Sequence, residues 1–140
     1  MIKVSTTQLW VHDQDEALEF WTKKVGFEVN TDVTVPEMGD FRWLTVNAPG
    51  QSEVAVVLMA VPDEPVMDAE TQKQVLDLTA KGFASTIFLT TDDCQKAYDE
   101  MSARGVEFTQ KPTEMPYGID TAFRDPSGNN IRLAQVTWDK

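Results

Sequence analysis

The sequence is poor in the residues from which disulfides, metal sites and catalytic pairs are built. Its 140 residues include one cysteine, Cys94, and one histidine, His12. A lone cysteine excludes a disulfide within the chain, and a lone histidine gives no spacing typical of a metal site or an acid–base pair. Cys94 follows Asp92 and Asp93, whose charges disfavour a thiolate. We interpret it as a structural residue in a reducing compartment.

Basic residues and long apolar runs are also scarce. The chain has 12 Lys and Arg residues against 23 Asp and Glu residues, and its formal net charge is −11. Because this charge repels phosphate backbones and anionic lipids, we expect no nucleic-acid partner and no membrane partner. No uncharged stretch approaches the length of a membrane span, and the first residues contain no apolar run of signal-peptide length. These features predict a cytoplasmic protein.

The chain does contain an internal repeat. Residues 6–13 have the pattern of a strand that leads into a helix ending at Gly26, and residues 86–93 lead into another helix ending at Gly105. In each half, three further strands follow, and a turn containing proline and glycine separates the last two. Each half therefore predicts the order β-α-β-β-β. Two such halves can form curved mixed sheets around a shared cleft.

Alternating apolar residues, helical spacing and turn residues locate the elements. The expected strands cover 4–11, 27–33, 41–46, 54–60, 85–91, 107–111, 121–124 and 130–136. The first expected helix is capped by Asp13 or Asp15 and ends at Gly26, and the others cover 68–81 and 94–104. With 41% hydrophobic residues, the chain suits one α+β domain, residues 1–140. We expect a first module of about residues 1–61, a connector of about 62–82 and a second module of about 83–140.

Two groups of motifs resemble those of a known superfamily. In the first half, Val11-x-Asp13 is followed by Ala17, Phe20-Trp21 and residues 25–29; the second half contains Tyr117-Gly118 and residues 123–133, which include Asp125-Pro126-Ser127-Gly128. These motifs resemble the vicinal oxygen chelate superfamily, which contains glyoxalase I, extradiol dioxygenases, and fosfomycin and bleomycin resistance proteins. The resemblance implies tandem β-α-β-β-β modules, often in a homodimer in which both chains build the site.

The resemblance also implies where a metal would be bound. In metal-dependent relatives, four ligands project from the first and last strands of the two modules. The shared motifs place these positions at Thr6, Leu58, Thr86 and Arg132. Two hydroxyls, an isobutyl group and a guanidinium are not a donor set for a divalent cation. We therefore predict no metal and no cofactor, and we expect neither glyoxalase I nor extradiol dioxygenase activity.

The residues expected on the concave face favour binding. By strand alternation these are Thr6, Gln8, Trp10, Val56, Leu58, Ala60, Thr86, Phe88, Thr90, Asn130, Arg132 and Ala134. We predict that a small, partly aromatic molecule contacts Gln8, Trp10, Phe88, Asn130 and Arg132. Trp10 and Phe88 can stack on its rings, and Arg132 can bind a carboxylate or another anion. Alternatively, the aromatic residues only fill space and Arg132 pairs with an acidic neighbour such as Asp120.

Two functions remain open at this stage. The first is metal-independent binding of a drug or metabolite, as in bleomycin resistance proteins, and the acidic surface suits a cationic drug. The second is a lyase, isomerase or oxygenase with an absent or relocated metal site and unknown catalytic residues. Its candidates are His12, Glu53 and Asp120, which face inward only if a strand register is shifted by one residue. The simpler interpretation makes His12 and Ser127 turn residues.

Overall fold

The computed structural model describes residues 1–138, and each half of the chain forms one four-stranded sheet. The first half contains β1 (Thr6–Val11), α1 (Gln14–Glu19), η1 (Phe20–Val25), β2 (Glu28–Val35), η2 (Pro36–Met38), β3 (Phe41–Asn47) and β4 (Ala55–Ala60). The helix α2 (Ala69–Ala80) connects it to β5 (Thr86–Thr90), α3 (Cys94–Ala103), β6 (Phe108–Met115), β7 (Gly118–Arg124) and β8 (Asn130–Val136). The predicted β-α-β-β-β order is confirmed in both halves. Residues 139 and 140, the end of the expected second module, lie outside the described residues.

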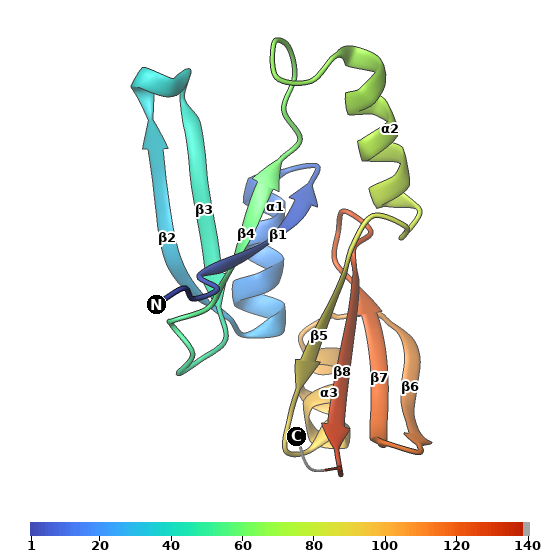
Figure 1. The fold of residues 1–140 in the computed structure, drawn as a ribbon. Coiled ribbons are helices and arrows are strands. Elements are labelled where there is room, and N and C mark those ends of the chain that lie inside the picture. Colours follow the sequence, from blue (N-terminus) through green and yellow to red (C-terminus); the bar gives the residue numbers. More distant parts are fainter. Residues whose placement is uncertain (139–140) are drawn as a thin grey trace.

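Both sheets are mixed, and each carries a helix on one face. The strand orders are β1-β4-β3-β2 and β5-β8-β7-β6. The first and last strands of each half pair in parallel, and the other pairs are antiparallel. In Figure 1, α1 lies behind β1 and β4, and α3 lies behind β5 and β8. The other face of each sheet, here called its open face, carries no helix from residues 1–138. The α+β fold class is thus confirmed.

Acidic side chains cap the N-termini of α1, α2 and α3. The carboxylates of Asp13, Asp68 and Asp93 each accept a hydrogen bond from the backbone N–H three residues later, which satisfies an otherwise unpaired donor of the first turn. The first helix continues as the π-helix η1 and ends at Gly26, whose φ of 94° suits glycine. None of the helices within residues 1–138 combines the length and the apolar character needed to cross a membrane.

The two halves share one hydrophobic core. The first half contributes Leu9, Val11, Ala17, Phe20, Trp21, Leu44, Val46, Val56 and Leu58, and the second contributes Met101, Val106, Phe123, Ile131 and Leu133. Phe20 and Phe123 meet across the boundary, with ring centroids 6.1 Å apart. The helix-covered faces of both sheets are therefore used for packing, which leaves the open faces available for other contacts.

The side chains of β4 lie on the opposite faces of the sheet from those predicted. In the parallel pair, Gln8 lies opposite Val57 and Trp10 lies opposite Met59, whereas Leu58 lies opposite Leu9. Leu58 is fully buried in the core on the helix side. The prediction that Val56, Leu58 and Ala60 share a face with Gln8 and Trp10 is therefore wrong. The reason is that β4 is apolar at every position, so its sequence contains no alternation from which to read the face.

The β6–β7 hairpin is longer than predicted. The expected strands ended at Lys111 and began again at Thr121, but β6 extends to Met115 and β7 begins at Gly118. Pro112 lies inside β6, which is tolerated because β6 is an edge strand and does not need every backbone N–H. The longer hairpin places Tyr117 beside the end of β8, where the Tyr117 carbonyl accepts a hydrogen bond from the Thr137 N–H.

The turn between β7 and β8 ties the second half to the first. Asp125 Oδ1 accepts hydrogen bonds from the backbone of Ser127 and Asn129, and Asn129 Nδ2 donates to the carbonyl of Trp10 over 2.8 Å. Burial raises the pKa of the Asp125 carboxyl, although these hydrogen bonds oppose the shift. Ser127 Oγ accepts from the backbone N–H of His12. Ser127 is thus a turn residue, as the simpler interpretation predicts.

Candidate functional site

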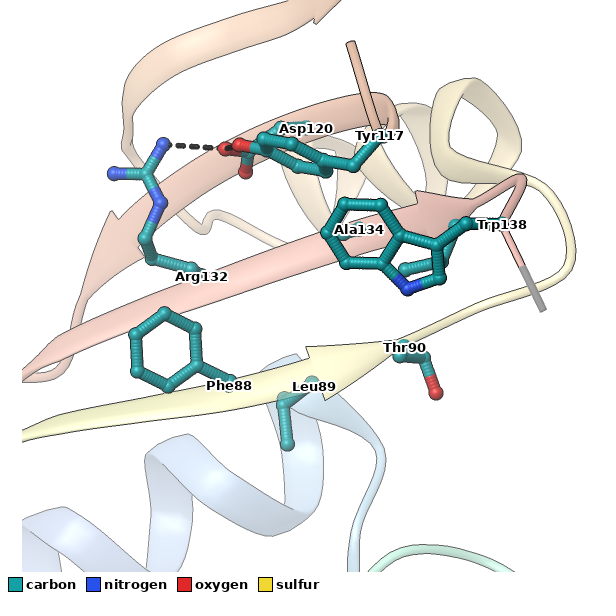
Figure 2. A pocket seen from close by; sticks show the side chains of 9 residues that line it. Phe88, Leu89, Thr90, Tyr117, Asp120, Arg132, Ala134 and Trp138 are labelled. Carbon is teal, nitrogen blue, oxygen red and sulfur yellow. Dashed lines mark hydrogen bonds and ion pairs between the residues drawn. The ribbon is translucent and has the colours of Figure 1, made fainter. Parts of the chain in front are cut away.

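A cavity of about 380 Å³ lies against the open face of the second sheet. Its lining residues come from β5, β7, β8 and the segments that follow β6 and β8: Phe88, Leu89, Thr90, Tyr117, Asp120, Arg132, Ala134, Val136 and Trp138. Strand register brings the central side chains together, because Arg132 lies opposite Phe88 on one side and opposite Ala122 on the other. Figure 2 shows Phe88 and Arg132 rising from neighbouring strands on the same side of the sheet.

The polar centre of the cavity is an ion pair with two further hydrogen-bonding side chains. Arg132 Nη2 donates to Asp120 Oδ2 over 2.7 Å and to Gln110 Oε1 over 3.0 Å. The Tyr117 hydroxyl donates to the same Asp120 oxygen over 2.5 Å. Only 2% of the Asp120 side chain is exposed, against 35% for Arg132. The structure therefore shows the arrangement that the sequence allowed as an alternative, in which Arg132 pairs with Asp120.

This network also shifts the pKa of Tyr117. The hydrogen bond to Asp120 raises the pKa of the Tyr117 hydroxyl, and burial raises it further. The neutral phenol donates a hydrogen bond to the carboxylate. The cavity thus contains an ion pair, Arg132–Asp120, whose partners are 2.7 Å apart.

Aromatic side chains form the walls around this polar centre. The rings of Tyr117 and Trp138 pack with centroids 5.4 Å apart. The exposed fraction is 58% for Trp138 and 75% for Phe88. Phe88 was predicted as a ligand contact because successive side chains of a strand alternate between its two faces. The same reasoning missed Tyr117 and Trp138, which lie just outside strands, and the only available signal was the Tyr117-Gly118 pair at the hairpin turn.

The structure brings together two of the five predicted ligand contacts. Phe88 and Arg132 line the cavity. Asn130 shares a face with Arg132 on β8, but its Nδ2 donates to the carbonyl of Gly82. Gln8 and Trp10 lie on β1, which belongs to the other sheet, and they do not line this cavity. Within one chain, the predicted contacts therefore belong to two separate open faces.

A second hollow of about 460 Å³ lies between the two halves. Its lining combines Val25, Phe27, Ala48, Pro49 and Gln51 with Phe88, Leu89, Thr90, Thr91, Ala97, Met101, Phe123 and Leu133. No ionisable side chain is among these residues. Ligand sites typically combine apolar walls with a few oriented polar groups. The cavity around Arg132 meets this description better than the hollow between the halves.

The four positions that the resemblance would assign to a metal do not fit one. Thr6 and Thr86 lie on different sheets, Leu58 points into the core, and Arg132 is paired with Asp120. Residues 1–138 contain no group of three or more His, Cys, Asp or Glu side chains that could hold a metal ion. We therefore derive no chemistry through a metal at these positions.

Two of the three alternative catalytic candidates lie away from the cavity. His12 is exposed at the end of β1, with Nε2 3.1 Å from the carbonyl oxygen of Leu76. Glu53 is exposed in the turn before β4. Asp120 is in the cavity, but its Oδ2 is already occupied by Arg132 and Tyr117. These positions bring no general acid–base pair together.

Comparisons with known proteins agree with the fold. Residues 3–133 match the sequence profile of the Glyoxalase/Bleomycin resistance protein/Dioxygenase superfamily. The chain is 37% identical to YurT, an uncharacterized protein of Bacillus subtilis (strain 168), over 96% of this chain and 99% of YurT. The crystal structure of UcmS2 is similar, with a TM-score of 0.89, 38% identity, and coverage of 96% of this chain and 98% of UcmS2. TnmS3, an antibiotic binding protein from Streptomyces sp. CB03234, has a TM-score of 0.73 and 28% identity, with 98% of each chain covered.

Proposed function

Because the chain belongs to the Glyoxalase/Bleomycin resistance protein/Dioxygenase superfamily, we propose that it binds a small, partly aromatic organic molecule without a metal. The site is the cavity around Phe88, Tyr117, Arg132 and Trp138. The description of TnmS3 as an antibiotic binding protein supports this class of function by analogy. Superfamily membership alone does not, because one fold can carry many activities.

The observation that carries the proposal is the exposure of large aromatic side chains around the Arg132–Asp120 ion pair. Phe88 and Trp138 leave more than half of their side chains exposed, at 75% and 58%. Apolar surface that remains exposed beside a cavity is typical of ligand sites. Each ring that stacks on a ligand contributes about 1 kcal/mol beyond the burial of its area. The polar groups of the cavity orient the ligand by hydrogen bonding.

The state of the polar groups supports the proposal of binding. Asp120, the buried carboxylate of the cavity, already accepts two hydrogen bonds, and Tyr117 is held as a neutral phenol. General acid–base catalysis needs a group that is free to exchange a proton with the substrate. The arrangement suits sequestration of an unchanged ligand.

We further propose a homodimer in which both chains build the site. The open face of the first sheet carries Gln8, Trp10 and Met59 from β1 and β4, together with Trp43 from β3. Placed over the cavity of a second copy, this face would bring Gln8 and Trp10 to Phe88 and Arg132. The five predicted contacts would then meet, and the two open faces would be covered at once.

Sedimentation equilibrium at micromolar concentration is expected to give twice the chain mass of 15.7 kDa. Trp10→Glu should shift the protein toward a monomer, because it places a charge at the centre of the apolar contact. Gln95→Glu, which adds the same charge on the exposed surface of α3, should remain dimeric. A monomeric wild-type protein would exclude a site shared by two chains.

For an aromatic ligand found by thermal-shift screening, Phe88→Ala is expected to weaken binding about tenfold, because one stacking contact is lost. Trp10→Ala should have a similar effect if a second copy completes the site. Titrations followed by tryptophan fluorescence or calorimetry measure both dissociation constants. Phe83→Ala is the matched control, since Phe83 is 81% exposed and does not line the cavity. Equal binding by the Phe88 and Phe83 variants would place the site elsewhere.

A further inference from the structure

We propose that Asp120 makes the cavity selective for uncharged aromatic molecules that carry a hydrogen-bond acceptor, and against aromatic carboxylates. This inference rests on the proposed function, because it concerns the ligand class of the same cavity. It replaces the sequence-based expectation of an anionic group at Arg132. The reason is the fixed position of a second charge beside that guanidinium.

Asp120 cannot move away to admit an anion. Its side chain is 2% exposed, and its Oδ2 is held by Arg132 over 2.7 Å and by the Tyr117 hydroxyl. A ligand carboxylate at Arg132 would therefore lie close to a buried carboxylate of the same charge. Two carboxylates that contact the same guanidinium repel each other strongly where water is partly excluded. The attraction of Arg132 for an anion is offset by this repulsion.

The cavity offers no other positive charge. Arg132 is the only cationic side chain among the lining residues, and Asp120 neutralises it. Tyr117 is a neutral phenol at physiological pH, and its hydrogen bond to Asp120 raises its pKa further. The formal net charge of the whole chain, −11, adds a field of the same sign as that of Asp120. Local and global electrostatics thus both disfavour an anionic ligand.

Arg132 nevertheless keeps donors for a ligand. A guanidinium has five N–H donors. Both hydrogen bonds that Arg132 makes within residues 1–138 come from Nη2, to Asp120 and to Gln110. The donors on Nε and Nη1 have no acceptor among these residues, and 35% of the side chain is exposed. A neutral acceptor such as a carbonyl or ether oxygen can use these donors without bringing a second negative charge beside Asp120.

The test compares two probes with the same ring system, 2-naphthamide and 2-naphthoate, which differ in charge. The wild-type protein is expected to bind 2-naphthamide about tenfold more tightly than 2-naphthoate. In Asp120→Asn, which keeps the shape and an acceptor oxygen but removes the charge, the ratio should shift by about tenfold or more toward 2-naphthoate. Asp99→Asn makes the same change in net charge on the exposed surface of α3 and should leave the ratio unchanged. Circular dichroism verifies that the variants are folded.

The outcomes separate this inference from the proposed function. A wild-type preference for 2-naphthoate, or an unchanged ratio in Asp120→Asn, overturns the role of Asp120 while aromatic binding stands. If the wild-type protein binds neither probe and Asp120→Asn binds 2-naphthoate, the role of Asp120 stands and the proposed binding of neutral aromatic molecules falls. If neither protein binds either probe, both proposals are overturned.

Discussion

Gly118→Ala is expected to lower the free energy of unfolding by about 3 kcal/mol or more. Gly118 begins β7 with a φ of 140°, a conformation that side chains rarely adopt. A Cβ at this position would overlap the backbone carbonyl of Gln135 on the neighbouring strand. Relief of the overlap requires β7 and β8 to separate at the rim of the cavity. The substitution should therefore also weaken ligand binding, since Tyr117 precedes this position.

Urea unfolding followed by circular dichroism measures the change. The matched control is Gly50→Ala, in the turn before β4, where φ is 77° and no atom lies within 4 Å of an added Cβ. This control carries only the cost of the backbone conformation, about 1–2 kcal/mol. Equal losses in the two variants would show that the contact with Gln135 has no energetic consequence.

Phe123→Ala is expected to cost about 3–5 kcal/mol of stability. Phe123 is fully buried on β7, on the face opposite to the cavity, and its ring packs against Phe108 of β6 and Phe20 of the first half. The substitution leaves a void where the two halves meet. Because dispersion contacts are lost on both sides of the boundary, the surrounding side chains can fill this void only partly.

Phe88→Ala serves as the comparison on the other face of the same sheet. Phe88 is 75% exposed, so its removal should change the free energy of unfolding by less than about 0.5 kcal/mol. Thermal and urea unfolding of both variants measure the contrast. If Phe88→Ala destabilised the protein as much as Phe123→Ala, its ring would have a structural role, and the assignment of Phe88 to a ligand site would lose its support.

Local signals in the sequence predicted most of the fold. The order of elements in each half, the helix start at Asp13 and the helix end at Gly26 depend mainly on local patterns, and the structure confirms them. The face of β4 could not be predicted, because all of its residues are apolar and both faces of the strand are suitable for burial. The sequence also predicted an end of β6 that is too early. A proline such as Pro112 usually ends a strand, and it is tolerated here because β6 lies at the edge of the sheet.

The site is formed by side-chain contacts between different strands, which local sequence patterns do not predict. Alternation on β5 and β8 was sufficient to put Phe88 and Arg132 on one face. The partner of Arg132 could only be offered as one alternative, because Asp120 lies on another strand and its side chain reaches Arg132 through the register of β7 and β8. Trp138 follows the last strand, where no periodic pattern marks its direction. The charge balance of the cavity is therefore a property of the fold.

The confinement of strand pairing to each half has a consequence for the order of folding. Every strand pairs only with strands of its own half, so each sheet can close before the halves touch. The contacts of Phe20 with Phe123 join residues that are much farther apart in sequence, and such contacts are costly to form early. We infer that docking of the halves follows the transition state. Substitutions at this boundary would then accelerate unfolding while leaving the folding rate nearly unchanged.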